Sequence, residues 1–170
     1  MHKVILVVGD VESVMEPFNE ELEVEPWYNE PLHENTKEEY LQYILDKDPT
    51  SVIKTFKELV EEYGVKDYTG SDEWRLNKDI WEVWSTYNQS GMWDWYERGG
   101  RWKDNITNIS GGTCDRIDKK NYKSHEMCGA IVINTEWYDE DNTENFKEKV
   151  KELISELDDS EWITTVDIHF

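Results

Sequence analysis

The chain has 170 residues and a formal net charge of −21, because 39 Asp and Glu residues oppose 18 Lys and Arg residues. This acidic balance argues against nonspecific binding to DNA or to an anionic membrane surface. No apolar run approaches the roughly 20 residues that a membrane-spanning helix needs, and the length fits one domain with a long insertion.

The first residues form a short apolar run, residues 3–8, which predicts a strand buried on both faces. The chain then turns acidic, unlike a signal peptide, and its two cysteines suggest reduced thiols in a cytosol. Nine acids and no Lys or Arg occur between Val4 and Thr36. Three prolines in this acidic stretch predict an extended wrapping segment rather than a helix.

Apolar residues recur at helical spacing in three segments of the next part of the chain, at about 37–48, 50–63 and 71–87. Gly64 follows the second segment at a position that favours glycine, and Ser71 begins the third. We therefore expect a helical block at about residues 36–90, inserted between the first strand and the rest of the chain.

The C-terminal part predicts a strand at 130–138, an amphipathic helix at 143–157 and a last strand at 162–170. Another strand is expected within 102–109, and a loop at 113–127. The predicted fold class is α+β: a small sheet with ferredoxin-like terminal strands and an inserted helical block. The whole chain, 1–170, is expected to form a single domain.

Aromatic rings, arginines and a diglycine are concentrated between residues 93 and 102, and a second diglycine follows at 111–112. Aromatic faces stack bases, glycine lets backbone N–H groups approach an anion, and the arginine fork matches a phosphate. The pattern predicts a pocket for a planar, negatively charged ligand. The candidate ligand-binding residues are Trp93, Trp95, Tyr96, Arg98, Gly99, Gly100, Arg101, Trp102, Gly111, Gly112, Thr113 and Arg116.

Two other interpretations of this stretch stay open. Its tryptophans can serve the core instead of a pocket, and alternation along a strand means that some of them must face inward. Between Arg98 and Lys123, seven basic residues oppose three acids, which makes 7 − 3 = +4. This basic stretch can attract an anionic ligand, or it can pair with the acidic N-terminal segment.

Neither a metal site nor a catalytic site is predicted. Cys114, His125 and Cys128 could supply three zinc ligands, but their spacing matches no common paired-cysteine pattern. His-x-His pairs, Walker loops and nucleophile elbows are missing from the sequence. His169 is expected to be a satisfied sheet histidine and Asp94 a helix cap. We therefore expect no enzyme activity and no cofactor.

Several motifs together resemble a large family of small phage proteins. They are VVGD at 7–10, PFN at 17–19, LEVEP at 22–26, WDWY at 93–96, GGRW at 99–102 and VDIH at 166–169. The family is similar to the phage sponges that counter cyclic-oligonucleotide (CBASS) immunity. The resemblance covers both ends and the middle motif, and the sequence departs from it at Ile168, where we would expect cysteine.

This resemblance implies an immune-evasion protein that acts in the host cytoplasm. It implies a non-enzymatic homo-oligomer, for example a tetramer, that sequesters a cyclic dinucleotide such as 3′,3′-cGAMP without cleaving it. Neither nucleic acid nor a membrane is an expected partner. The alternative is an acidic DNA mimic, or a protein inhibitor of a host defence factor, whose working face would be the nine acids of the N-terminal segment.

Overall fold

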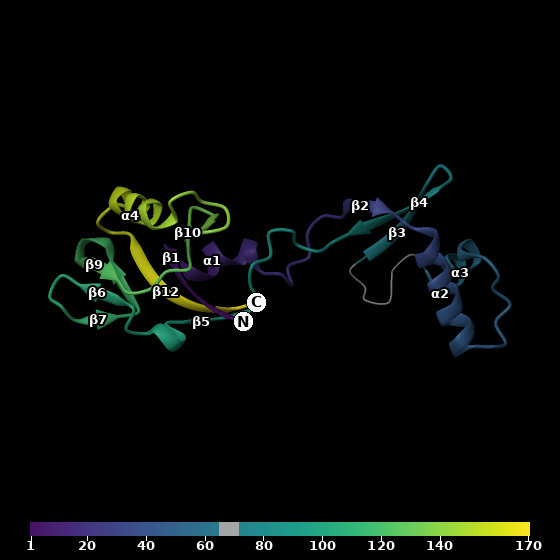
Figure 1. Cartoon of the computed structure of the whole chain (residues 1–170), viewed down its shortest axis with the longest axis horizontal. Coiled ribbons are helices and arrows are strands. Elements are labelled where there is room, and N and C mark those ends of the chain that lie inside the picture. The colour runs from purple at the N-terminus through teal and green to yellow at the C-terminus, as the bar shows by residue number, and fades with distance from the viewer. Residues whose placement is uncertain (65–71) are drawn as a thin grey trace. The chain divides into compact units, whose positions relative to one another are not determined.

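The computed structural model of the chain describes residues 1–64 and 72–170. By their contacts these residues form two compact units, Met1–Leu22 with Asn88–Phe170, and Glu23–Tyr87 (Figure 1). Each unit has its own sheet and its own apolar core. Among the described residues, no helix has the length and apolar character required to cross a membrane. The insertion predicted at about 36–90 overlaps the second unit.

The first unit is built on a six-stranded sheet, in which β1 and β12 occupy the centre and β8 shares the β5 side of β12. The path through the other strands runs β11-β10-β1-β12-β5. The strands are β1 (His2–Val8), β5 (Trp95–Arg98), β8 (Arg116–Asp118), β10 (Ala130–Ile133), β11 (Glu136–Asp139) and β12 (Trp162–His169). The α+β class is confirmed, and both terminal strands do share one sheet.

The strand order differs from a ferredoxin-like sheet in one respect. β1 runs antiparallel to β12 and parallel to β10, so the first strand of the β10–β11 hairpin lies beside β1. In a ferredoxin-like sheet the second hairpin strand takes that place. All four residues of β10 are buried, whereas β11 begins with the exposed Glu136. The apolar strand therefore takes the inner position.

Both faces of this sheet are covered, which explains why its central strands are apolar throughout. On one face, α1 (Val11–Met15) and the 3₁₀ turn η1 (Glu16–Phe18) pack on Ile5, Val7 and Val166. On the other, α4 (Phe146–Glu156) packs on a second cluster around Leu6 and Ile131. The helix predicted at 143–157 is confirmed, but the segment after Gly9 is not purely extended. Asp10 caps α1 by accepting the backbone N–H of Ser13.

A small three-stranded sheet, ordered β7-β6-β9, lies within the first unit. Its strands are β6 (Ile106–Asn108), β7 (Thr113–Cys114) and β9 (Tyr122–His125). Two 3₁₀ turns flank them, η2 (Gly100–Trp102) and η3 (Lys119–Asn121). The strand expected within 102–109 is confirmed. The loop predicted at 113–127 is wrong, because this polar segment pairs with β6 and, through β8, with β12. The partly buried Cys114, Ile117 and Tyr122 hold it on the core.

The strand predicted at 130–138 is confirmed in its first part as β10, and the remainder of the range belongs to β11, the second strand of a hairpin. Ile133 pairs with Glu136, so Asn134 and Thr135 form a two-residue turn. Both have positive φ, 51° and 62°. Turns with two positive φ angles match the right-handed twist of a hairpin, and Asn tolerates this conformation better than most residues.

The second unit combines two helices with a three-stranded sheet ordered β2-β4-β3. Its elements are β2 (Trp27–Pro31), α2 (Glu34–Lys47), α3 (Phe56–Tyr63), β3 (Asp72–Asn77) and β4 (Ile80–Ser85). The first predicted helix is confirmed. The second is confirmed only from Phe56, because Thr55 and Glu58, rather than a residue near 50, form a capping box at the start of α3. The core contains Phe56, Leu59 and Trp74.

The third predicted helix is wrong. Ser71 lies outside the described residues, and residues 72–85 form a hairpin whose two-residue turn has Lys78 at φ 57°. Aromatic and β-branched residues dominate β4, and such residues favour strands. Their spacing fits a helical stripe as well as it fits two strands, so periodicity alone could not distinguish the two.

Candidate functional site

The loop that carries Gly99, Gly100 and Arg101 folds around a carboxylate of the protein itself. Asp167 on β12 has a side chain only 2% exposed, and its Oδ2 accepts the backbone N–H of Arg101 at 3.3 Å. The Arg101 Nε lies 3.8 Å from the same oxygen. A Cβ on Gly100 would lie 2.5 Å from the Cβ of Asp167. The predicted anion-binding loop thus already holds an internal anion.

Three of the four backbone donors expected from the two diglycines, those of Gly99, Gly111 and Gly112, have internal acceptors. Gly99 N–H donates to the carbonyl oxygen of Thr165 at 2.8 Å. In the second diglycine, Gly111 N–H donates to the carbonyl of Asn108 and Gly112 N–H to its side-chain oxygen. These glycines therefore serve turns, and their N–H groups are not directed at an external phosphate.

The four candidate aromatics divide between core and surface. Trp93 is buried, and its indole N–H donates to the carbonyl of Met15. Tyr96 packs edge-on against it, with ring centroids 4.9 Å apart. Trp93 is therefore a core residue, which corrects its assignment as a stacking surface. Trp95 is 48% exposed, and Trp102 is half-buried.

The remaining candidates are spread over the surface of the first unit. Arg98 pairs with Glu12 at 3.2 Å, and the Arg116 guanidinium lies over the ring of Trp162, 4.7 Å from its centroid. The hydroxyl of Thr113 donates to Asp104. Pairing of the basic stretch with the acidic N-terminal segment is thus seen once, at Arg98 and Glu12.

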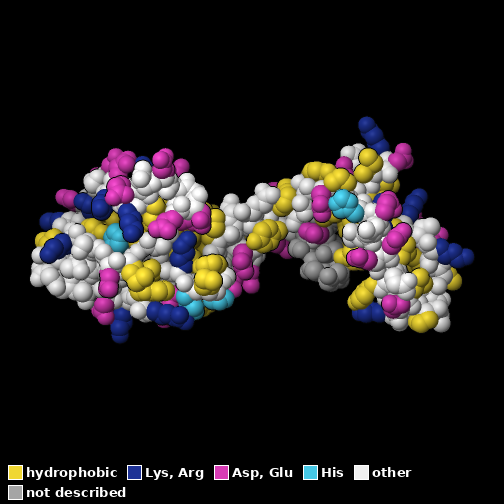
Figure 2. All heavy atoms as spheres, viewed as in Figure 1, with side chains coloured by type: hydrophobic (Ala, Val, Ile, Leu, Met, Phe, Trp, Pro, Cys, Tyr) yellow, Lys and Arg dark blue, Asp and Glu magenta, His cyan; other side chains and the backbone are white. Residues whose placement is uncertain are grey.

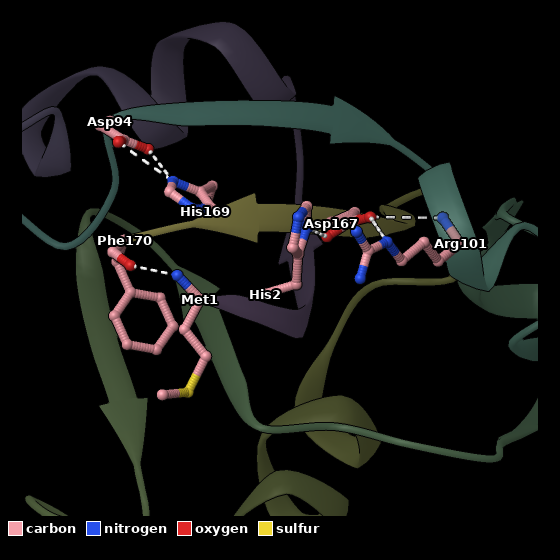
Figure 3. Close-up of polar contacts among 7 residues, drawn as sticks. All are labelled: Met1, His2, Asp94, Arg101, Asp167, His169 and Phe170. Atoms are coloured by element: carbon pink, nitrogen blue, oxygen red, sulfur yellow. Dashed lines mark hydrogen bonds and ion pairs between the residues drawn. The ribbon is translucent and has the colours of Figure 1, made fainter.

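Two histidine–aspartate pairs lie side by side at one end of the large sheet (Figure 3). His2 of β1 is opposite His169 of β12, and their ring centroids are 5.3 Å apart. His2 Nδ1 donates to Asp167 at 2.8 Å. His169 Nδ1 donates to Asp94 at 2.9 Å and 3.1 Å from its two oxygens. The expectation of a satisfied sheet histidine is confirmed for His169, which lies in β12 and is paired with Asp94. The helix cap expected at Asp94 is wrong, because Asp94 lies just before β5 and its carboxylate binds His169.

The charges at this end of the sheet are mostly negative. Asp94, Asp167 and the exposed Glu97 oppose two cations, the guanidinium of Arg101 and the N-terminal ammonium of Met1, which donates to the carbonyl of Phe170. Glu97 is the register partner of Asp167 on β5. Because like charges repel at short range, this end suits a cation better than a phosphodiester.

A cleft of about 520 Å³ with the opposite charge lies between β9 and α4. Its lining residues are Lys119, Tyr122, Lys123, Ser124, His125, Lys151, Ile154 and Ser155. Three are lysines and none is acidic. Figure 2 shows Lys and Arg side chains gathered around a histidine between these two elements. The volume falls within the roughly 300–1,000 Å³ of small-molecule sites.

One side of the cleft is formed by a tyrosine–histidine pair. Burial raises the pKa of Tyr122 to about 12, so its hydroxyl keeps its proton. Burial, followed by the charge of Lys151, lowers the pKa of His125. The Tyr122 hydroxyl therefore donates to Nδ1 of a neutral His125, at 2.6 Å. That assignment places the ring hydrogen of His125 on Nε2, so Nε2 is a hydrogen-bond donor.

Zinc binding by Cys114, His125 and Cys128 receives no support from the geometry. Among residues 1–64 and 72–170, no group of three or more Cys, His, Asp or Glu side chains could hold a metal ion. The Cys128 thiol donates to the carbonyl of Ala130, and burial raises its pKa to about 12.

The chain matches no protein-family model, no curated protein and no solved structure. The properties of the molecule therefore have to be inferred from its own residues. None of the predicted ligand-binding residues lines this cleft. Sequence reasoning identified His125 only as a possible zinc ligand and Lys119 and Lys123 only as part of the basic stretch, and Lys151 is brought beside them by the packing of α4.

Proposed function

We propose that the protein binds and sequesters a cyclic dinucleotide, such as 3′,3′-cGAMP, without cleaving it. The observation that supports this most is a cleft lined by three lysines in a chain with a net charge of −21. Each phosphodiester of such a ligand carries one negative charge, and an ammonium donor to a charged group contributes about 1.5–3 kcal/mol.

The cleft supplies the other groups that this ligand needs. The Nε2–H of His125 and the hydroxyls of Ser124 and Ser155 can donate to phosphate or ribose oxygens. The ring of Tyr122 and the side chain of Ile154 supply apolar surface against a base. We therefore locate the proposed ligand at this cleft rather than at the Gly99–Arg101 loop, whose guanidinium already faces Asp167.

Calorimetry with a panel of cyclic di- and trinucleotides tests this proposal. Lys123→Gln and Lys151→Gln should each weaken binding of the tightest ligand about 10- to 100-fold, since each removes one charged donor. Lys147→Gln is the matched control, because Lys147 is an exposed lysine on α4 that does not line the cleft. The ligand should be recovered intact after binding.

Two results would contradict parts of the proposal. If no cyclic nucleotide binds the wild-type chain, sequestration is wrong. If a ligand binds equally to both lysine variants but is lost in Arg101→Ala, the ligand site is at the Gly99–Arg101 loop instead. A homo-oligomer, and the alternative of an acidic mimic that inhibits a host protein, stay predictions from the sequence.

A further inference from the structure

We propose that His2 and His169 form a bidentate site for a borderline transition-metal ion of the Zn²⁺ class. The inference does not depend on the proposed nucleotide function, because the two histidines line no part of the lysine cleft. It rests on the pairing of β1 with β12, on the carboxylate partner of each imidazole and on the charge at this end of the sheet.

The strand register brings the two imidazoles together. His2 and His169 are direct partners across an antiparallel pair, and such side chains project on the same side with Cβ atoms about 4.5–5.5 Å apart. Zinc binds imidazole nitrogen at about 2.0–2.1 Å, so two nitrogens on one tetrahedral ion lie about 3.3 Å apart. The ring centroids of His2 and His169 lie 5.3 Å apart. This centroid separation is larger than the nitrogen separation required by the ion, and the difference is about the size of the rings.

Both imidazoles have the proton arrangement of a metal ligand. A carboxylate can only accept, so the contacts to Asp167 and Asp94 place the hydrogen of each neutral ring on Nδ1. Each Nε2 then carries a lone pair. Within the described part of the chain, neither Nε2 has a hydrogen-bond partner. Metal-binding histidines typically donate their other nitrogen to a carboxylate in this way, which fixes the ring and raises its basicity.

The surroundings favour a cation and leave it accessible. Asp94 and Asp167 lie directly behind the imidazoles; the Arg101 guanidinium offsets the charge of the almost fully buried Asp167, and the charge of Asp94 has no Lys or Arg partner among the described residues. The side chains of His2 and His169 are 26% and 42% exposed. With two protein ligands, the ion keeps open positions for water or an exogenous donor. Imidazole selects zinc, nickel or copper over magnesium and calcium.

The experiment is calorimetric titration of the whole untagged chain with ZnCl₂ and, separately, NiCl₂, in excess Mg²⁺ to occupy exposed carboxylates. We expect one ion per chain. His2→Gln and His169→Gln should each lower the affinity about tenfold or more, and Asp94→Asn about 10- to 100-fold, as for other carboxylate partners of metal-bound histidines. His33→Gln should leave the affinity unchanged, because His33 is an exposed histidine of the second unit that pairs with Glu30.

A second readout separates ligation from a loss of structure. The chain has four histidines, so ¹⁵N spectra of their imidazoles are resolvable one by one. Zn²⁺ should shift Nε2 of His2 and His169 and leave His33 and His125 unchanged. The proposal is overturned if wild type binds no Zn²⁺ or Ni²⁺, if a folded His169→Gln variant binds as tightly as wild type, or if the shifts appear at His33 or His125.

Discussion

Gly100 determines whether the loop at residues 99–101 can close on Asp167. It has φ 49°, and a Cβ there would meet the Asp167 side chain at 2.5 Å. Asp167 in turn binds His2 on its other oxygen. One glycine therefore controls the position of a carboxylate shared by an arginine and a histidine.

Gly100→Ala should lower the free energy of unfolding of the first unit by about 2–5 kcal/mol, the sum of a strained backbone and a steric clash in a packed site. Gly111→Ala is the control, because Gly111 also has positive φ, 89°, but nothing lies within 4 Å of its added Cβ. It should lose only about 1 kcal/mol. Urea unfolding of both variants measures the difference, and equal losses would refute the close contact.

The candidate site shows what sequence reasoning can recover at the scale of single residues. The composition of residues 93–102 predicted a pocket for an external anionic ligand, because glycine and arginine suit that task, but the loop at 99–101 surrounds an anion of the protein itself. The anion is Asp167, which lies 66 residues beyond Arg101. His2 and His169 lie near opposite ends of the sequence, and only the strand register makes them neighbours. Neither pairing leaves a signal in local spacing.

Helices and the two central strands were predictable from the sequence, and hairpins were not. The helices α2, α3 and α4 follow from apolar periodicity, β1 from its continuous apolar run and β12 from its β-branched residues. The β3–β4 and β10–β11 hairpins were missed because neither turn contains glycine. Lys78 and Thr135, which take positive φ, give little indication of a turn, and Asn134 favours a turn but is not followed by glycine.

The β10–β11 turn offers a test of this explanation. Thr135 is β-branched and has φ 62°, a conformation that costs such residues about 1–3 kcal/mol. Thr135→Gly should raise the free energy of unfolding by about 1 kcal/mol, after the entropy cost of glycine is subtracted. Asn134→Gly should gain less, because Asn already tolerates this region. Thermal unfolding of both variants provides the comparison; destabilisation by Thr135→Gly would contradict the turn assignment.

At the scale of the whole molecule, the two units have separate cores. Leu32, Phe56, Trp74 and their neighbours in the second unit form one cluster, and the two clusters of the first unit contain none of these residues. A destabilising substitution in one core should therefore lower the stability of its own unit first.

Trp74→Ala should destabilise the second unit by about 3–5 kcal/mol, the usual cost of truncating a buried aromatic. Trp74 is 4% exposed and packs against Phe56 and Tyr40. Hydrogen exchange resolved by peptide should show lost protection in α3 and β4 and unchanged protection in β1 and β12. A loss of protection in all four elements would mean that the units unfold together.

The central position of β1 and β12 has a consequence for how the chain is made. β1 precedes β12 by about 150 residues, yet they pair from His2 opposite His169 to Val8 opposite Ile163 in the middle of the sheet. A chain leaving the ribosome therefore carries β1 with its β12 edge unpaired until β12 has emerged. Strands that are far apart in the sequence pair slowly, and an unpaired edge of an apolar strand can associate with other chains. A chaperone that binds β1 would prevent this association until β12 pairs with it.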